Sequence, residues 1–246
     1  MGLDNIPVKE LLLKSIQTLY EDHSIQINWK ARKRELKKLA DILQKLEAQI
    51  PEGYIPLRIA CSALLTQRVS LKTINFPKSL QDWVEVWKQI KPKEKENLSE
   101  SFSCWLKSRG NHRFANKFGD YYSNYWKSRN WSLKNSLKDL NELRSISTAE
   151  DVKKWWMQFD GIGAQYGKNI PMDEMDQRFL NYVKIDHRLS NIVDASGGQK
   201  LNSAEKQELY KFVARRLKIT AWEIDRFCFS FYKEIIANIS SRKNNG

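Results

Sequence analysis

The sequence predicts an all-α protein, and three kinds of observation support that fold class. Apolar residues recur three and four positions apart along most of the chain, as in the leucine stripe between residues 36 and 46. Strand-like alternation or β-branching is confined to two short runs, 25–28 and 182–185. Ser and Thr precede several apolar runs, where their side-chain oxygens would cap the first turn of a helix. We therefore expect helices joined by short turns.

Length and charge limit the kinds of partner. The 246 residues suffice for one large domain or for two small domains that share a cleft. The chain has 42 Lys and Arg against 29 Asp and Glu, a formal net charge of +13 that is spread along its length. Such a balance favours a polyanionic partner, because binding releases condensed counterions. No apolar run approaches roughly eighteen residues and no signal-peptide pattern is present, so we expect no membrane partner and a location in the cytoplasm or nucleoid, or in the nucleus of a eukaryote.

The three cysteines, Cys61, Cys104 and Cys228, lie far apart in apolar stretches and form no CxxC pair. A structural zinc or an iron–sulfur cluster needs four ligands at close spacing. We therefore expect small buried side chains in a reducing compartment, and no metal held by side chains.

Prolines and glycines divide the first half of the chain into helical segments. Four prolines between residues 51 and 92 leave one helix over 57–74 and another over 81–90. In the segment 101–131, a turn at Gly110 would present the basic side chains around it to solvent. These are Arg109, His112 and Arg113. The aromatic residues that follow fall at helical spacings, which predicts that they pack in a core. They are Phe114, Phe118, Tyr121, Tyr122 and Tyr125.

The C-terminal part, residues 201–239, predicts two consecutive amphipathic helices. Ser203 with Gln207 would begin the first helix. Thr220 with Glu223 would begin the second as a capping box, in which each residue binds a backbone amide of the other.

The stretch FDGIGAQYGKNI, residues 159–170, contains three glycines within seven positions. A dinucleotide-binding glycine loop follows a buried strand, whereas residues 147–159 begin with a helix cap and continue at helical spacing. The sequence therefore predicts a helix, a tight Gly-x-Gly hairpin, and a second helix that breaks at Ile170-Pro171. The backbone amides of such a hairpin point outward and can bind a DNA phosphate without reading the base sequence.

Followed by VKIDHR at residues 183–188, this hairpin resembles that of the helix-hairpin-helix DNA glycosylase superfamily, which includes endonuclease III and the 8-oxoguanine, adenine and 3-methyladenine glycosylases. The matching residues are Asp160-Gly161-Ile162-Gly163 in the hairpin and Ile185-Asp186 in the catalytic turn. Two further stretches are similar to the family, ALLTQRVSLKTIN at 63–75 and ITAWEIDRF at 219–227.

The resemblance covers roughly residues 50–235 and implies a two-lobed helical fold with a central cleft that binds DNA and holds the active site. The segments it implies are residues 1–50, N-terminal helices that pack on the body; residues 51–160, a lobe that carries the loop inserted into DNA; and residues 161–246, which hold the hairpin, the catalytic turn and the C-terminal helices.

The resemblance also implies a chemistry for two residues. Asp186 would stabilise the positive charge that develops on the sugar as the base departs and would orient the attacking water, a role compatible with capping a helix over 187–193. Gln165 stands where bifunctional relatives have a lysine that attacks the sugar, and an amide nitrogen is not a nucleophile. The expected activity is therefore a monofunctional DNA repair glycosylase, which releases a damaged or mismatched base and leaves an abasic site.

Alternatives remain open at this point. Lys168 or Lys184 could supply the amine of a bifunctional glycosylase and AP lyase, although each is more simply a phosphate contact or a solvated charge. The chain could also be a catalytically inactive DNA-binding helix-hairpin-helix protein. Asp160 departs from the usual proline of the hairpin, and it either places a negative charge near the phosphate or caps the next helix.

The remaining implied roles concern DNA contacts and the base. Gln67 is matched to the residue that fills the space left by the extruded base. The expected DNA contacts are Gly161, Ile162, Gly163, Ala164, Gln67, Arg68, Lys168 and Arg188. The candidates for the base pocket or the opposite base are Tyr166, His112 and Arg113, with Trp155 and Trp156 as further walls.

The expected partner is lesion-containing double-stranded DNA, bound by a monomer. No cofactor and no iron–sulfur cluster are expected, and a monovalent cation at the hairpin carbonyls is a family feature that no side chain here indicates. Alkylated purines are the preferred substrates, because a cationic base leaves easily and can be held on an aromatic face. Oxidised guanine and mismatched uracil or thymine stay open.

Overall fold

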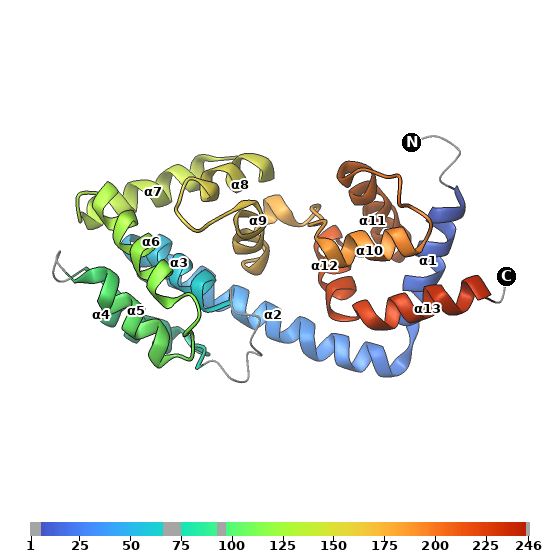
Figure 1. Cartoon of the computed structure of the whole chain (residues 1–246), viewed down its shortest axis with the longest axis horizontal. Helices are drawn as coiled ribbons and strands as arrows, with labels where there is room; N and C mark the ends of the chain where they lie inside the picture. Colours follow the sequence, from blue (N-terminus) through green and yellow to red (C-terminus); the bar gives the residue numbers. More distant parts are fainter. Residues whose placement is uncertain (1–5, 66–74, 93–96, 245–246) are drawn as a thin grey trace. The chain divides into compact units, whose positions relative to one another are not determined.

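The computed structural model describes residues 6–65, 75–92 and 97–244. Within these ranges all regular structure is helical and no strand occurs, which confirms the predicted all-α class (Figure 1). None of the described helices combines the length and apolar character needed to cross a membrane.

The chain forms two compact units, which we call the central unit, Lys38–Glu174, and the terminal unit, Met1–Lys37 together with Met175–Gly246. The boundaries differ from those expected after residues 50 and 160. One reason is that helix α2 (His23–Gln49) contributes its first part to the terminal unit and its second part to the central unit, with the observed boundary after Lys37. Another is that the N-terminal helix packs on helices of the C-terminal part, a long-range contact that local sequence patterns do not indicate.

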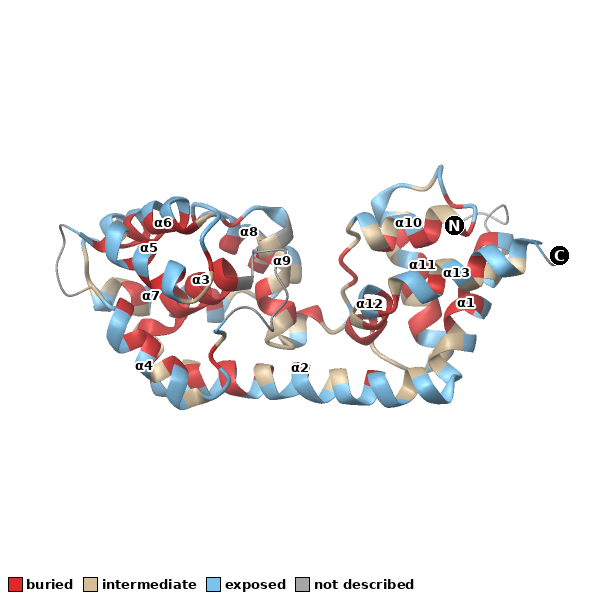
Figure 2. Cartoon of the chain, turned by 60° about the horizontal axis from the view of Figure 1, so that its bottom comes forward, coloured by how far each residue is buried: buried red, intermediate tan, exposed pale blue. Residues whose placement is uncertain are grey.

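The central unit begins with the second part of α2 and, in its described residues, continues through seven helices and one 3₁₀ turn. These are η2 (Pro51–Gly53), α3 (Tyr54–Leu65), α4 (Leu80–Ile90), α5 (Leu98–Ser108), α6 (Ala115–Ser128), α7 (Leu133–Ser145), α8 (Ala149–Met157) and α9 (Ala164–Asp173). Buried residues lie on the inner faces of these helices (Figure 2).

Aromatic side chains fill the core of the central unit. Phe102 of α5 and Tyr122 of α6 stack with their ring centroids 4.0 Å apart. The predicted aromatic core is confirmed for Phe118, Tyr122 and Tyr125, while Phe114 and Tyr121 are half-buried. The turn at Gly110, where φ is +92°, leaves His112 and Arg113 exposed as predicted, whereas Arg109 is half-buried.

The terminal unit contains α1, the first part of α2 and four C-terminal helices. The elements not yet given bounds are α1 (Ile6–Glu21), η3 (Gln177–Phe179), α10 (His187–Ala195), α11 (Ser203–Leu217), α12 (Ala221–Ser230) and α13 (Tyr232–Asn244). Helix α1 packs on α11 and α13, and α10 packs on α12 and α13.

Glu223 of α12 joins distant parts of the terminal unit. Its Oε1 accepts hydrogen bonds from Tyr20 Oη at 3.0 Å and Trp29 Nε1 at 3.3 Å, and it pairs with Lys33 Nζ at 2.6 Å. Burial, aided by this carboxylate, raises the pKa of Tyr20 to about 12. The expected capping box at Thr220 is therefore only half formed: Thr220 Oγ1 accepts from the Glu223 amide, but the Glu223 carboxylate binds α1 and α2.

Three other predicted helix ends are corrected. Pro171 lies inside α9, which continues to Asp173, because proline removes a single N–H and the helix ends within a turn of it. Helix α11 is capped by Asn202 in a box with Glu205, not by Ser203. The C-terminal part holds three helices, since α12 ends before Phe231 and α13 follows.

The helix expected over 57–74 begins earlier, at Tyr54, and its described part ends at Leu65. The run 25–28 lies within α2, and residues 182–185 have no regular secondary structure. The expectation that the cysteines are buried holds for Cys61 and Cys228 but is wrong for Cys104, which is exposed on α5.

Candidate functional site

The glycine-rich stretch forms the predicted hairpin between two helices, α8 and α9. Gly161 has φ +81°, a left-handed conformation that favours glycine. Ile162 is only 4% exposed, and its amide donates to the Phe159 carbonyl at 3.0 Å, which closes the turn on the core. Gly163 is extended, with φ −76° and ψ 177°, and is the N-cap of α9. The apolar residue anchors the hairpin while both glycines and Ala164 stay exposed.

The three glycines of the hairpin region differ in how much space a side chain would have at their positions. A Cβ atom on Gly161 would lie 2.3 Å from Cδ2 of Tyr121, and one on Gly167 would lie 2.9 Å from the Lys153 carbonyl oxygen, so these positions allow close packing. A Cβ on Gly163 would meet nothing within 4 Å. The open space at Gly163 lies at the N-terminus of α9, and no side chain caps that helix. Such a helix start is suited to an anion.

Asp160 does not cap α9, as the sequence had left open. Its Oδ2 accepts from Asn124 Nδ2 at 3.0 Å, a hydrogen bond that joins the hairpin to α6. The negative charge of Asp160 therefore takes part in holding the turn, and the side chain is exposed.

Asp186 is the N-cap of α10, as predicted. Its Oδ1 accepts from the amides of Arg188 at 2.9 Å and Leu189 at 3.0 Å. The side chain is half-buried. Two amides thus fix the carboxylate at the point where a segment without regular structure enters a helix.

The surroundings of Asp186 hold features that the sequence did not indicate. The Lys184 amide donates to Oδ2 of Asp225 at 2.7 Å. The guanidinium of Arg188 lies over the ring of Phe229, 4.4 Å from its centroid, and Phe229 is 39% exposed. In the sequence, Phe229 cannot be distinguished from the buried apolar residues of the same helix, so its exposure is apparent only from the structure.

The two candidate lysines differ in accessibility. Lys184 is 7% exposed, whereas Lys168 on α9 is half-buried. Burial of Lys184 removes most of the surface through which its amine could meet a DNA sugar.

A small cavity of about 120 Å³ lies between α3 and α9 in the central unit. Tyr166 lines it, together with Arg58, Cys61, Ser62, Asn169, Ile170 and Asp173. His112 and Arg113 do not line it, and Trp155 and Trp156 are buried in the core. Neither tryptophan lines this cavity, and their place in a base pocket stays a prediction.

Arg58 is a buried cation beside this cavity. It forms an ion pair with Glu174, and its Nη2 donates to the Ile170 carbonyl at 2.9 Å. Although burial opposes the charged form, Glu174 raises the pKa of the Arg58 guanidinium above its usual range. The pair joins α3 to the end of α9 and so supports the helix that follows the hairpin.

The predicted site residues belong to both units. The hairpin, Ala164, Tyr166 and Lys168 lie in the central unit, and Asp186 and Arg188 lie in the terminal unit. Gln165 is in the first turn of α9. Gln67 and Arg68 lie outside the described residues.

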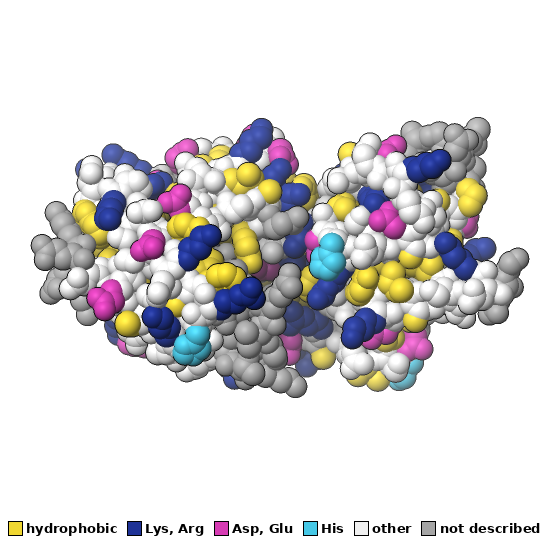
Figure 3. Space-filling view, viewed as in Figure 1, with side chains coloured by type: hydrophobic (Ala, Val, Ile, Leu, Met, Phe, Trp, Pro, Cys, Tyr) yellow, Lys and Arg dark blue, Asp and Glu magenta, His cyan; other side chains and the backbone are white. Residues whose placement is uncertain are grey.

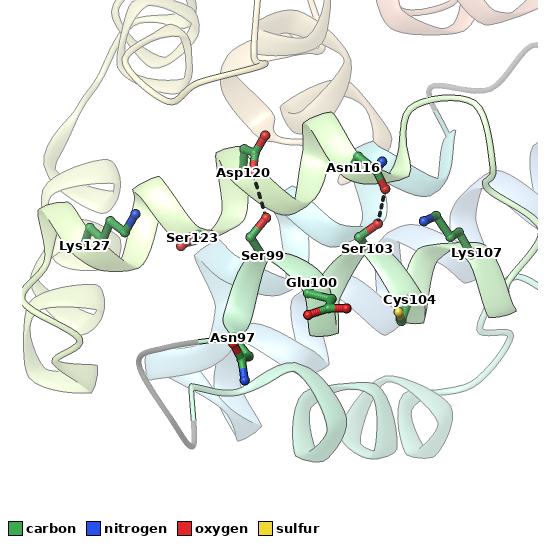
Figure 4. A pocket seen from close by; sticks show the side chains of 10 residues that line it. All are labelled: Asn97, Ser99, Glu100, Ser103, Cys104, Lys107, Asn116, Asp120, Ser123 and Lys127. Carbon is green, nitrogen blue, oxygen red and sulfur yellow. Dashed lines mark hydrogen bonds between the residues drawn. The ribbon is translucent and has the colours of Figure 1, made fainter.

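A larger groove of about 550 Å³ lies along α5 and α6 and contains none of the predicted residues (Figure 4). Its polar side chains bind one another: Ser99 donates to Asp120 at 2.7 Å, and Ser103 donates to Asn116 at 2.7 Å. Among the residues that the structure describes, no group of three or more His, Cys, Asp or Glu side chains could hold a metal ion. On the face shown in Figure 3, Lys and Arg side chains are scattered over both units.

Comparison with known proteins identifies one solved structure with a similar fold. No protein-family model matches the sequence, and a search of curated proteins gives no match. The fold is similar to that of the crystal structure of Methanocaldococcus jannaschii 8-oxoguanine DNA glycosylase, with a TM-score of 0.52 at 14% sequence identity. The match covers 93% of this chain and 96% of that one, so both units of the chain take part in the shared fold.

Proposed function

We propose that the protein is a DNA glycosylase, and that it is monofunctional. The observation that carries the proposal is the Asp186 carboxylate, fixed by two backbone amides in a chain that also has an open helix-hairpin-helix. The fold shared with a DNA glycosylase supports the glycosylase part of the proposal.

In the proposed reaction the enzyme extrudes the damaged nucleotide from the duplex, which costs a few kcal/mol of lost stacking. The Asp186 carboxylate then stabilises the positive charge that builds on the sugar and orients a water toward the anomeric carbon. The bond between the anomeric carbon and the base nitrogen breaks, and its electron pair leaves with the base. The water oxygen bonds to that carbon and gives a proton to the Asp186 carboxylate, and an abasic site remains. A carboxylate held by amides needs no reorganisation as charge develops, which is the source of its effect on rate.

Three candidate positions for a nucleophilic amine support the proposal that there is no lyase step. Gln165 offers no amine at the position of the family's nucleophile. Lys184 is almost fully buried. Lys168 lies one turn from the hairpin on α9, where a phosphate contact is its simpler role.

DNA binding is proposed to use both units. The first amides of α9 and the exposed glycines would hold a phosphate, since a helix N-terminus carries partial positive charge. Arg188 on Phe229 offers a cation and an aromatic face beside the Asp186 turn. Gln67 and Arg68 remain the proposed residues that enter the duplex.

Two substrate classes are the leading candidates for the proposed enzyme. Alkylated purines are favoured by the chemistry of a monofunctional enzyme, and the similar structure is that of an 8-oxoguanine glycosylase. We propose that the enzyme acts as a monomer on duplex DNA in the compartment that holds the genome, without a metal cluster.

A panel of single-lesion duplexes tests the proposal. Each duplex carries one alkylated purine, 8-oxoguanine, uracil or a mismatched thymine and is incubated with excess protein. We expect one lesion to yield strand breaks only after alkali, and no covalent adduct with borohydride. Breaks without alkali together with a trapped adduct would show a lyase, and intact bases on every duplex would refute glycosylase activity.

A further inference from the structure

The segment that leads into Asp186 has no regular structure, so its backbone groups need partners elsewhere. Helix α12 supplies two of them. The Trp222 amide donates to the Leu180 carbonyl at 2.9 Å, and the Asp225 carboxylate accepts from the Lys184 amide at 2.7 Å. The two bonds hold the segment near both of its ends.

Asp225 is an unusual anchor because it is 2% exposed. Burying a carboxylate is unfavourable unless hydrogen bonds and charges compensate, so a hydrophobic or amide side chain would be the less costly way to fill this place. The carboxylate differs from an apolar residue in one respect: it forms a charge-assisted, and therefore short and strong, bond with a backbone amide. That amide belongs to Lys184, two residues before Asp186.

We propose that Asp225 is a positioning residue, which fixes the 184–186 segment so that the Asp186 carboxylate is held in its reactive place at the start of α10. The catalytic part of this inference rests on the proposed function, in which Asp186 faces the sugar. Asp225 itself touches no reacting atom in this proposal.

Charge couples the two carboxylates. Burial raises the pKa of Asp225 to about 6, the nearby positive charges and the Lys184 hydrogen bond lower it, and Asp186 raises it. The titratable groups that face Asp225 come from the 184–186 segment, α11 and α12. They are Lys184, Asp186, Tyr210, Arg226 and Cys228. Protonation of Asp225 in mildly acidic solution therefore weakens the bond that holds the segment.

Two variants of the full chain separate positioning from simple packing. Asp225→Asn keeps an oxygen that accepts from the Lys184 amide but cannot ionise, whereas Asp225→Ala removes the acceptor. The first readout is single-turnover base release and the dissociation constant on the same lesion duplex, measured across pH. The second is hydrogen exchange of the Lys184 amide, which does not depend on catalysis.

We expect Asp225→Ala to release base about 10- to 100-fold more slowly with unchanged DNA binding, because small misplacements of a reacting group cost that much. Its Lys184 amide exchanges faster. Asp225→Asn is expected to release base, at every pH, at the slower rate that the wild type reaches below about pH 6, because its neutral amide oxygen bonds the Lys184 amide more weakly than a carboxylate does. If Asp225→Ala does not fold, the Asn variant and the pH dependence of Lys184 exchange in the wild type decide the matter.

The inference is overturned if Asp225→Ala releases base at the wild-type rate, or if the Lys184 amide exchanges equally in all three proteins. A wild type that releases no base from any duplex refutes the proposed function instead. The Lys184 exchange data then decide by themselves whether Asp225 anchors the segment.

Discussion

The turn of the hairpin allows a stability prediction with a built-in control. Gly161 has φ +81°, and a Cβ atom there would lie 2.3 Å from Cδ2 and 2.6 Å from Cε2 of Tyr121. An alanine in the left-handed region costs about 1–2 kcal/mol. Forcing a methyl group against a packed ring costs about 1–3 kcal/mol more. Gly161→Ala should therefore lower the free energy of unfolding by about 2–5 kcal/mol.

The matched variant is Gly163→Ala, two residues away. Gly163 has φ −76°, and an added Cβ would meet nothing within 4 Å. Its substitution should change the free energy of unfolding by less than about 1 kcal/mol, since a weaker N-cap is offset by a less flexible unfolded chain. Urea denaturation of both variants provides the comparison. Equal losses in the two variants, or a Gly161→Ala protein as stable as the wild type, would refute the argument.

Three further predictions concern ion pairing, pH and salt. Glu174→Ala should lower the free energy of unfolding by about 3–5 kcal/mol, because it removes the carboxylate that pairs with the buried Arg58. The control is Glu47→Ala, which breaks the exposed pair with Arg144. It should lower the free energy of unfolding by about 1 kcal/mol or less in the same urea titration. Burial raises the pKa of Asp225 from 3.8 to about 6, so the folded state binds its proton more tightly and the free energy of unfolding should fall by up to about 3 kcal/mol as pH rises between these values. The free energies of unfolding of wild type and Asp225→Asn are therefore compared across this pH range. If their difference does not change with pH, a group other than Asp225 causes the fall. Affinity for duplex DNA should fall about 10³-fold or more between 50 and 200 mM salt if six or more phosphates are contacted, and a salt-insensitive affinity would contradict the electrostatic argument.

Local features of the site could be predicted from sequence because they depend on neighbouring residues. Asp186 before an amphipathic run specifies an N-cap, and the Gly-x-Gly stretch after a helix specifies a turn. The same local logic failed where two capping residues are adjacent, since Asn202 begins α11 in place of Ser203.

Features that depend on residues far apart in the chain could not be predicted. The Glu223 carboxylate fits a local capping box, but in the fold it binds Tyr20 and Lys33 about two hundred positions away. Asp225 reads in sequence as a polar residue on a helix, and only packing shows that it is buried against the Lys184 amide. Pairing of the N-terminal helices with the C-terminal part likewise depends on tertiary contacts.

The most direct test of the proposed chemistry is base release by Asp186→Asn, with DNA binding measured on the same duplex. Asparagine is as good an N-cap as aspartate, so α10 and the fold should be retained. The matched control is Asp22→Asn, which changes another carboxylate that accepts a backbone amide, that of Ile25, in the terminal unit. We expect Asp186→Asn to release base at least about 100-fold more slowly with unchanged affinity, and Asp22→Asn to behave as wild type. Base release by Asp186→Asn at the wild-type rate would contradict the account.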